Sequence, residues 1–422
     1  MFSQGGLSLE QAPPLSVVLR FFLTASIFGI LLGLFLFSTN LNIISLSGYT
    51  TQIVTIHLLA LGIMASFMLG ALFQMLPVIA GVVIQSPLKK ITIIHGLFVI
   101  GVLTQLSAFS YQELPLLYLL SALYLGVALL YAITLMLKEL FKVKTHSSSS
   151  QGIIFALLAF ILTIFLGIYL LLVEGGFVSA SLFTEVKELH YSFALFGWLS
   201  LLIVSVSFQV IEMFYVTPKY PTVMSNYLTF SIFILLIVKS LSLLFGYTLP
   251  LITTAISILF LLYATITLDR LNQRKRPTSD ATVWFWRLGM GLLIISSTIT
   301  LLHSFLYVDK TLIHISYVTF IGFGLSIVLA MVYKIVPFLT WFHLSNQGYM
   351  EAPMMHDVIH PKKAKIHFYI HITMIVLWIV LPQLSVLGSL LIIFSFGWLL
   401  YNLIFAMKKY AYTQKHTEKI EW

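Results

Sequence analysis

The chain has 422 residues, of which 59% are hydrophobic and only 9% are charged, and its mean hydropathy is +1.02. Soluble domains carry roughly a quarter charged residues, so this composition excludes a soluble domain and indicates a polytopic membrane protein. The chain has no cysteine, which excludes disulfides and thiolate ligation and leaves histidine and methionine as ligands for soft metals.

Apolar runs of about 20 residues, the length that crosses a bilayer as a helix, recur along the whole chain. The N-terminal segment has no basic stretch and no small-residue cleavage site, so we expect the first helix to be retained. We predict an all-α protein with about twelve transmembrane helices, centred on residues 16–38, 50–84, 91–110, 115–137, 152–173, 190–216, 225–246, 248–268, 284–306, 311–342, 365–386 and 387–407.

The basic residues predict the orientation of these helices. Seventeen of the 23 Lys and Arg residues lie in the even-numbered turns or near the C-terminus, whereas only Lys187 and Lys310 lie in odd-numbered turns. Cytoplasmic loops carry the excess of positive charge, so we expect a multi-pass protein of the cytoplasmic (inner) membrane with both termini in the cytoplasm. This topology accounts for the net charge of +9, and the basic run 270–276 is an anchor of this kind. No nucleic-acid partner is expected.

The helices group into three blocks of four within a single integral membrane domain, 1–422. Polar linkers at 138–152 and 269–280 separate the blocks, and the second helix of each block begins near a histidine. We therefore predict three pseudo-symmetric repeats, over about 16–137, 152–268 and 284–407. The second helix of each repeat begins at His57, His190 or His314.

The histidines fall into two predicted layers. His57, His190 and His314 share the outer half of the membrane with His303, because their helices run inward and His303 ends the preceding helix on that side. A second group begins the third and eleventh helices from the cytoplasmic side: His95, His367 and His371.

Repeated imidazoles in a hydrocarbon setting are typical of functional sites. Neutral imidazole is a strong ligand for haem iron, and we predict that His57 and His314 hold one b-type haem. The alternative is a polar contact between helices. Gly62 and Gly70 leave room for a macrocycle or for a close helix neighbour.

The remaining polar residues have weaker assignments. His190 and His303 are candidate ligands of a copper ion or alternative partners of the haem, unless they are interfacial residues. His95, His367 and His371 form either a second metal or cofactor site or a polar cluster at the cytoplasmic edge; the last two are four residues apart, on one helical face. Lys239 lies well inside the seventh helix and needs an anionic partner, such as a haem propionate, unless its side chain reaches the outer surface.

The motif H-x4-G-x7-G-x6-P-x3-G resembles the second helix of the NnrS family, and here it comprises His57, Gly62, Gly70, Pro77 and Gly81. Members of that family are haem- and copper-containing membrane proteins of nitric-oxide metabolism, related in architecture to subunit I of the haem–copper oxidases. The resemblance implies an oxidase-like fold, with His57 as the haem ligand of the second helix.

In the comparison with the haem–copper oxidases, His314 matches the first histidine of their H-x-H pair on the tenth helix, and His190 matches their copper ligand on the sixth. Three departures from the oxidase pattern argue against an oxygen reductase. Ser316 replaces the second histidine of the pair, Ala194 replaces a tyrosine, and the seventh helix has no His-His pair.

We therefore expect a haem-binding, and on the weaker evidence copper-binding, membrane protein of nitric-oxide metabolism or resistance. If the protein is an enzyme, the resemblance implies an oxidoreductase acting on nitric oxide or another small diatomic molecule, in electron transport. Two alternatives stay open: a transporter of a metal ion or small solute with histidine ligands, and a cofactor-free subunit of a respiratory complex. Whether the chain forms a homo-oligomer or binds respiratory subunits is not specified by the sequence.

Overall fold

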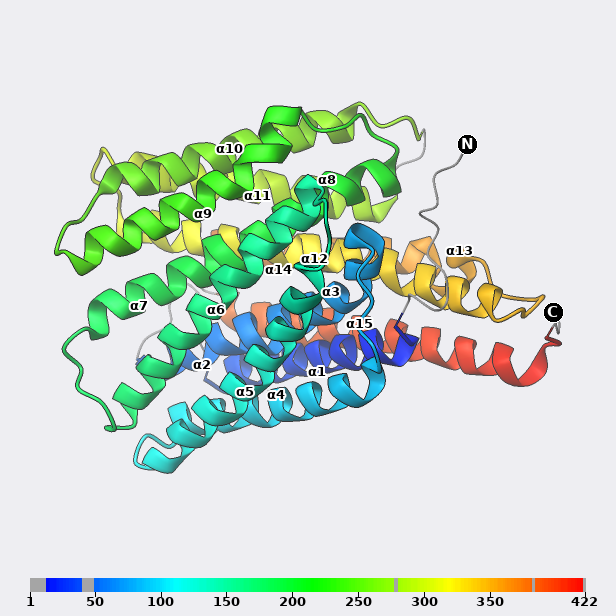
Figure 1. Ribbon diagram of the computed structural model, residues 1–422, viewed down its shortest axis with the longest axis horizontal. Coiled ribbons are helices and arrows are strands. Elements are labelled where there is room, and N and C mark those ends of the chain that lie inside the picture. The colour runs from blue at the N-terminus through cyan, green and yellow to red at the C-terminus, as the bar shows by residue number, and fades with distance from the viewer. Residues whose placement is uncertain (1–12, 40–48, 277–279, 382–383, 420–422) are drawn as a thin grey trace. The chain divides into compact units, whose positions relative to one another are not determined.

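A computed structural model of the protein describes residues 13–39, 49–276, 280–381 and 384–419, and within these ranges the regular elements are all helical (Figure 1). Twelve of the helical segments are long and apolar enough to cross a membrane. The prediction of an all-α, multi-pass membrane protein is therefore confirmed, and the apolar outer surfaces fit a lipid bilayer as surroundings. The three pseudo-symmetric blocks, the oxidase-like architecture and the orientation of the termini stay predictions.

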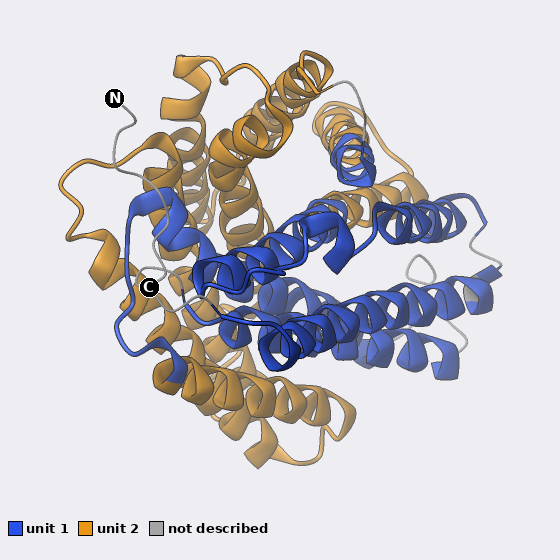
Figure 2. Cartoon of the chain, turned by 90° about the vertical axis from the view of Figure 1, so that its right-hand side faces the viewer, with its two compact units in different colours: residues 1–88, 278–289, 325–422 blue, residues 89–277, 290–324 orange. Residues whose placement is uncertain are grey.

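The chain divides into two compact units (Figure 2). Unit 1 comprises residues 1–88, 278–289 and 325–422, and unit 2 comprises residues 89–277 and 290–324. Two helices, α11 (Ala281–His303) and α12 (Lys310–Asn346), contribute residues to both units. The other helices of unit 1 are α1 (Leu15–Thr39), α2 (Tyr49–His57), η1 (Leu58–Ala65), α3 (Ser66–Ala80), α13 (Met355–Val358), α14 (Pro361–Val380) and α15 (Ser385–His416).

Unit 2 is built around a long helix, α6, that contacts most of its neighbours. Its N-terminus is capped by Ser147, whose hydroxyl accepts a hydrogen bond from the amide of Ser150 at 3.2 Å. Apart from its first two residues, α4 (Pro87–Ser110) also belongs to this unit. The helices that lie wholly in unit 2 are α5 (Pro115–Leu140), α6 (Ser148–Glu174), α7 (Phe183–Ser192), η2 (Phe193–Leu199), α8 (Ser200–Tyr215), α9 (Thr222–Leu244) and α10 (Pro250–Asn272).

The predicted spans agree with these helices to within four residues except at three ends. The eleventh span ends at Val380 rather than 386, and residue 386 belongs to the last span instead. At the other two ends the helices run further than the apolar runs. The sixth span begins at Phe183 rather than near 190, and the last continues to His416 rather than 407. Hydropathy marks only the segment that prefers lipid, whereas main-chain hydrogen bonding continues past the first charged side chains. The extra turns accordingly contain charged residues: Glu185, Lys187 and Glu188 at one end, and Lys408, Lys409 and Lys415 at the other.

Two π-helical segments interrupt the membrane helices. In unit 1, η1 follows His57 directly, and in unit 2, η2 begins three residues after His190. A π segment inserts an extra residue into the helical turn, is rare, and is frequent at functional sites. The helix that contains His314 has no such segment, since α12 is α-helical throughout. The second and sixth spans thus share a π segment, and the corresponding tenth span, in the third predicted repeat, has none.

Close helix packing in unit 1 depends on glycine. A Cβ atom at Gly29 of α1 would lie 2.1 Å from Cγ of Phe396 in α15, and one at Gly70 of α3 would lie 2.8 Å from Cβ of Phe21 in α1. Small residues at such positions let membrane helices approach each other closely. These contacts hold α1 against both α3 and α15.

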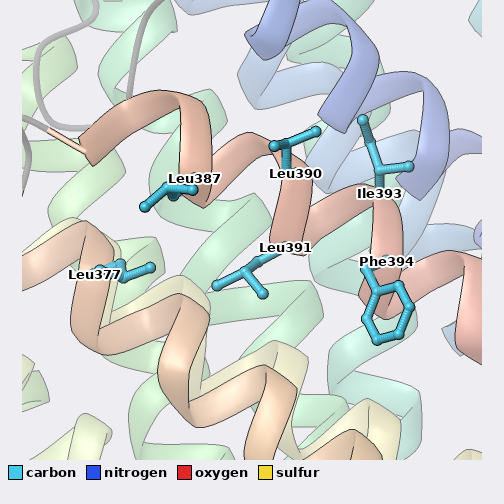
Figure 3. Close-up of a pocket in the computed structure, with 6 residues that line it drawn as sticks. All are labelled: Leu377, Leu387, Leu390, Leu391, Ile393 and Phe394. Carbon is cyan, nitrogen blue, oxygen red and sulfur yellow. The ribbon is translucent and has the colours of Figure 1, made fainter.

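Residues of α14 and α15 line an apolar groove of about 570 Å³ (Figure 3). Large exposed apolar surfaces are where a membrane protein meets lipid, and this groove offers no polar group to a ligand. Its lining consists of aliphatic and aromatic side chains: Leu377, Leu387, Leu390, Leu391, Ile393 and Phe394.

Candidate functional sites

His57 ends α2 and is half-buried, and its ring is held by the main chain. Its Nδ1 lies 2.8 Å from the carbonyl oxygen of Ile53, one turn earlier. A carbonyl only accepts hydrogen bonds, so Nδ1 is the protonated nitrogen and Nε2 carries the lone pair. Metal-binding histidines are commonly oriented in this way, through a backbone carbonyl at the other ring nitrogen.

The glycines that follow His57 bring a helix close. A Cβ atom at Gly62 would lie 3.0 Å from Cβ of Phe28, and Gly70 faces Phe21 and Phe22 in the same way. Of the two uses that the sequence allows for these glycines, the structure therefore shows close packing against α1. The space over them is not available to a macrocycle.

His190 repeats the arrangement of His57 in unit 2. Its Nδ1 lies 3.0 Å from the carbonyl oxygen of Thr163 in α6, so here too Nδ1 donates and Nε2 carries the lone pair. The ring packs over Gly167, where a Cβ atom would lie 2.9 Å from Cε1 of the imidazole. Gly167 is thus required for the close approach of this ring to α6.

Lys239 of α9 lies beside the turn that contains His190. Its Nζ forms an ion pair with Glu188 at 2.9 Å and donates a hydrogen bond to Ser192 at 3.1 Å, and it lies 5.9 Å from the ring centroid of Tyr191. Glu188 is therefore the anionic partner that a lysine at this depth needs. Its predicted contact with a haem propionate is not needed to explain its burial.

His303 and His314 are both exposed. His303 is the last residue of α11, and His314 lies in the first turns of α12, both in unit 2. His57 belongs to unit 1. Joint ligation of one haem by His57 and His314 stays a prediction.

A polar cluster lies in unit 1, around His367 of α14. The ring is fully buried, with Nδ1 2.8 Å from the hydroxyl of Tyr333 in α12 and Nε2 2.7 Å from the hydroxyl of Ser395 in α15. The amide nitrogen of Asn402 reaches the Tyr333 hydroxyl at 3.5 Å and donates to the Trp398 carbonyl at 2.8 Å. A continuous chain of polar groups thus joins three helices.

His371 lies one turn further along α14 and is equally buried. Its Nε2 is 2.9 Å from the hydroxyl of Ser326 in α12. Its Nδ1 is buried and, among the described residues, has no hydrogen-bond partner. The ring of Phe285 in α11 packs against both imidazoles, with centroids 6.0 Å from His367 and 5.4 Å from His371.

The sequence alone did not single out the hydroxyl partners of His367 and His371, although the spacing of these partners along their helices is regular. Ser326 and Tyr333 are seven residues apart, and so are Ser395 and Asn402, so each pair occupies one face of its helix two turns apart. His95, which the sequence groups with His367 and His371, is half-buried in α4 of unit 2. A site shared by all three stays a prediction.

An ion pair lies where α11 begins. The Asp280 carboxylate contacts Nζ of Lys334 in α12 and accepts hydrogen bonds from the hydroxyl and amide of Thr282 and from the amide of Val283, the last at 3.3 Å. Burial alone would raise the pKa of Asp280, but the Lys334 ammonium and these hydrogen bonds hold it below its ordinary value. The carboxylate both caps α11 and neutralises Lys334.

No three His, Asp or Glu side chains gather into a metal-binding group among the described residues. A haem needs only one or two imidazoles, so this finding bears on copper and not on haem. Copper held by His190, His303 or the other histidines stays a prediction.

The fold and these sites define a class: a helical, multi-pass membrane protein with oriented and deeply buried histidines. Comparison of the sequence with protein-family models finds no match, and comparison with curated proteins finds no detectable relative. The likeness of residues 57–81 to the NnrS family therefore rests on that motif alone.

Proposed function

We propose that this protein is an NnrS-like, haem-binding membrane protein in which His57 would hold the iron of one b-type haem. The observation that carries the proposal is the geometry of His57, whose Nδ1 is fixed by the Ile53 carbonyl immediately before a π-helical segment. This geometry presents a neutral imidazole with a defined tautomer, which is the form that binds iron. His314 is the second ligand by resemblance, and His190 and His303 are the residues for a copper ion.

The chain's own residues supply orientation and surroundings. The Ile53 carbonyl sets the ring plane of His57 and increases the basicity of Nε2 by accepting the proton at Nδ1. The contact of Gly62 and Gly70 with α1 fixes the helix that follows His57. A bound haem would supply an iron site for nitric oxide or another small diatomic molecule, which the resemblance to NnrS favours.

The first experiment is a reduced-minus-oxidised spectrum of the purified protein, with pyridine haemochrome and metal analysis of the same sample. A b-type signal near one haem per chain, lost in His57→Ala and retained in His416→Gln, supports the proposal; His416 is exposed and bonded locally to the Tyr412 carbonyl. Unchanged haem content in a folded His57→Ala variant overturns the role of His57. A colourless protein from a haem-sufficient host overturns haem binding altogether.

One observation favours a second function, that of a transporter. The chain of polar groups around His367 lies inside apolar helices, where polar and ionisable residues commonly mark solute or proton pathways. Histidine-dependent uptake of a metal ion or small solute into proteoliposomes by a colourless protein would select this function over the first.

A further inference from the structure

Three lysines at the start of α14 have no carboxylate partner among the residues that the structure describes. Lys362, Lys363 and Lys365 occur in none of the ion pairs of these residues, although the lysines inside α9 and α12 each have one. Lys409 of α15 donates to the main-chain carbonyl of Asp357, just before α14, at 2.7 Å, and not to its carboxylate. The three cations of α14 are therefore available to an anion that does not belong to the chain.

Two of these lysines lie over aromatic rings. Nζ of Lys363 is 3.9 Å from the ring centroid of Phe405 and 4.9 Å from that of Tyr401, both in α15. Nζ of Lys365 is 5.1 Å from the ring centroid of Trp284 in α11. An aromatic face attracts an ammonium group electrostatically and leaves its positive charge in place. The rings therefore position these cations and do not neutralise them.

The rings over which Lys363 lies belong to a row along one face of α15. Successive ring centroids are separated by 6.4, 5.9 and 6.4 Å, and the spacing of four, three and four residues keeps the rings on one side of the helix. The indole in this row donates from Nε1 to the Lys363 carbonyl at 3.0 Å, which ties the row to α14. The other three side chains are exposed. The members of this aromatic row are Phe394, Trp398, Tyr401 and Phe405.

The aromatic row ends at the apolar groove of unit 1. Phe394, its first member, also lines that groove together with aliphatic residues of α14 and α15 (Figure 3). From Phe394 to Phe405 the row spans eleven residues, or roughly 17 Å at about 1.5 Å per residue. This length is close to half the thickness of the hydrocarbon core of a bilayer, which is about 15 Å. The lysines and the groove are therefore separated by the depth of one layer of lipid acyl chains.

We propose that this surface of unit 1, comprising the three lysines, the aromatic row and the groove, is a binding site for one anionic phospholipid. Its phosphate group lies among Lys362, Lys363 and Lys365, because clustered lysines at the end of a membrane helix attract anionic headgroups. One of its acyl chains lies along the aromatic row and ends in the groove, whose lining side chains are all apolar. Each end of the lipid thus meets the kind of surface that suits it, and the site is independent of haem at His57.

The test uses the full-length protein in phosphatidylcholine vesicles that contain a small fraction of a lipid brominated in its acyl chains. Bromine quenches tryptophan fluorescence at short range, so Trp398 in the aromatic row reports on the chain that lies there. Its share of the quenching is the difference between the wild type and Trp398→Phe, which keeps an aromatic ring at this position. Brominated phosphatidylglycerol and brominated phosphatidylcholine are compared at equal fractions, and we expect the first to associate with this site about tenfold more strongly.

Two double variants locate the preference for the anionic lipid. Lys363→Gln with Lys365→Gln should bring the association constants of the two lipids to near equality, since it removes the two cations that the rings position. It leaves the bond from Trp398, which is made to a main-chain carbonyl. Lys89→Gln with Lys90→Gln removes the same charge from the start of α4 and should keep the preference of the wild type.

A comparison of chain lengths tests the groove. Phosphatidylglycerol with short acyl chains has the same headgroup but cannot reach from the lysines to the groove, so it should displace the brominated lipid far more weakly than the long-chain form does. Equal displacement by the short-chain lipid or by inorganic phosphate would show that the phosphate group alone is bound, and would overturn the proposal. Equal quenching of Trp398 by the two brominated lipids would overturn it as well, and so would a preference that both double variants lose or both keep.

Discussion

His57 and His367 both lie in unit 1, yet the protein holds their rings in opposite ways. His57 donates from Nδ1 to a main-chain carbonyl of its own helix, whereas His367 lies between two hydroxyl groups from two other helices. The first arrangement permits only one tautomer and depends on local sequence. The second depends on the packing of α12, α14 and α15. The Nε2 atom of His57 is not used in the bond to Ile53, whereas both ring nitrogens of His367 are bonded to side chains.

His190 extends the comparison to unit 2. Like His57, it donates from Nδ1 to a carbonyl and lies just before a π-helical segment. Its carbonyl partner, however, is Thr163 of another helix, and an ion pair of Glu188 with Lys239 lies beside it. His57 and His190 therefore share one ring tautomer, which a local carbonyl sets at His57 and a carbonyl of a neighbouring helix sets at His190.

The largest effect that separates the two kinds of histidine is expected in haem content. His57→Ala should lower haem per chain by about tenfold to a hundredfold, since even outer-shell partners of a ligand contribute that much to metal affinity. His367→Ala should leave haem content unchanged, because both of its ring nitrogens are already bonded to side chains. Pyridine haemochrome on the two variants in parallel measures this, and equal losses in both would remove the distinction.

The free energy of unfolding should depend on the hydrogen-bond partners of His367. Tyr333→Phe leaves a ring nitrogen of His367 without its partner in a buried site, which costs about 1–3 kcal/mol. Tyr369→Phe is a matched control, because Tyr369 lies on the same helix as His367 and is exposed. The free energy of unfolding in mixed micelles measures both, and a Tyr333→Phe variant as stable as the control would mean that the polar chain does not hold these helices together.

The number and extent of the membrane helices could be predicted from the sequence because lipid imposes a length and an apolar composition on each span. The histidines could be singled out for the same reason, as polar residues in apolar runs. The position of Lys239 within an apolar run also predicts that it has an anionic partner. Its partner Glu188 lies 51 residues earlier in the chain, and only the packing of α7 against α9 brings the two together.

The network of His367 could not be predicted, although every member is visible in the sequence. Serine, tyrosine and asparagine occur often in membrane helices, and a spacing of seven residues gives the face of a helix but not the neighbour it meets. The π segments could not be predicted for a different reason. They arise from one extra residue per turn in a uniformly apolar stretch, a change of main-chain register that composition does not reveal.

A smaller effect is expected at the ion pair beside His190. Glu188→Gln leaves the ammonium of Lys239, whose side chain is only 13% exposed, without its charge partner. Because Glu188 is itself about a third exposed, we expect a loss of about 1 kcal/mol rather than the larger cost of a fully buried pair. Lys239→Met combined with Glu188→Gln should recover most of it, and a double-mutant cycle on the free energy of unfolding measures the coupling. Additive losses would show that the pair contributes little to holding this turn.

The smallest effect is a dependence of stability on pH at the start of α11. The pKa of Asp280 is lowered in the folded protein, so its ionised form stabilises the fold above the ordinary pKa of about 3.9. This contribution is lost as the pH falls through the lowered pKa, since protonation breaks the contact with Lys334. Because Asp280 is partly exposed, we expect about 1 kcal/mol or less. Unfolding of the wild type and of Asp280→Asn should therefore differ at pH 6 and converge towards pH 3. A constant difference over that range would show that Asp280 acts through hydrogen bonds that do not depend on its charge.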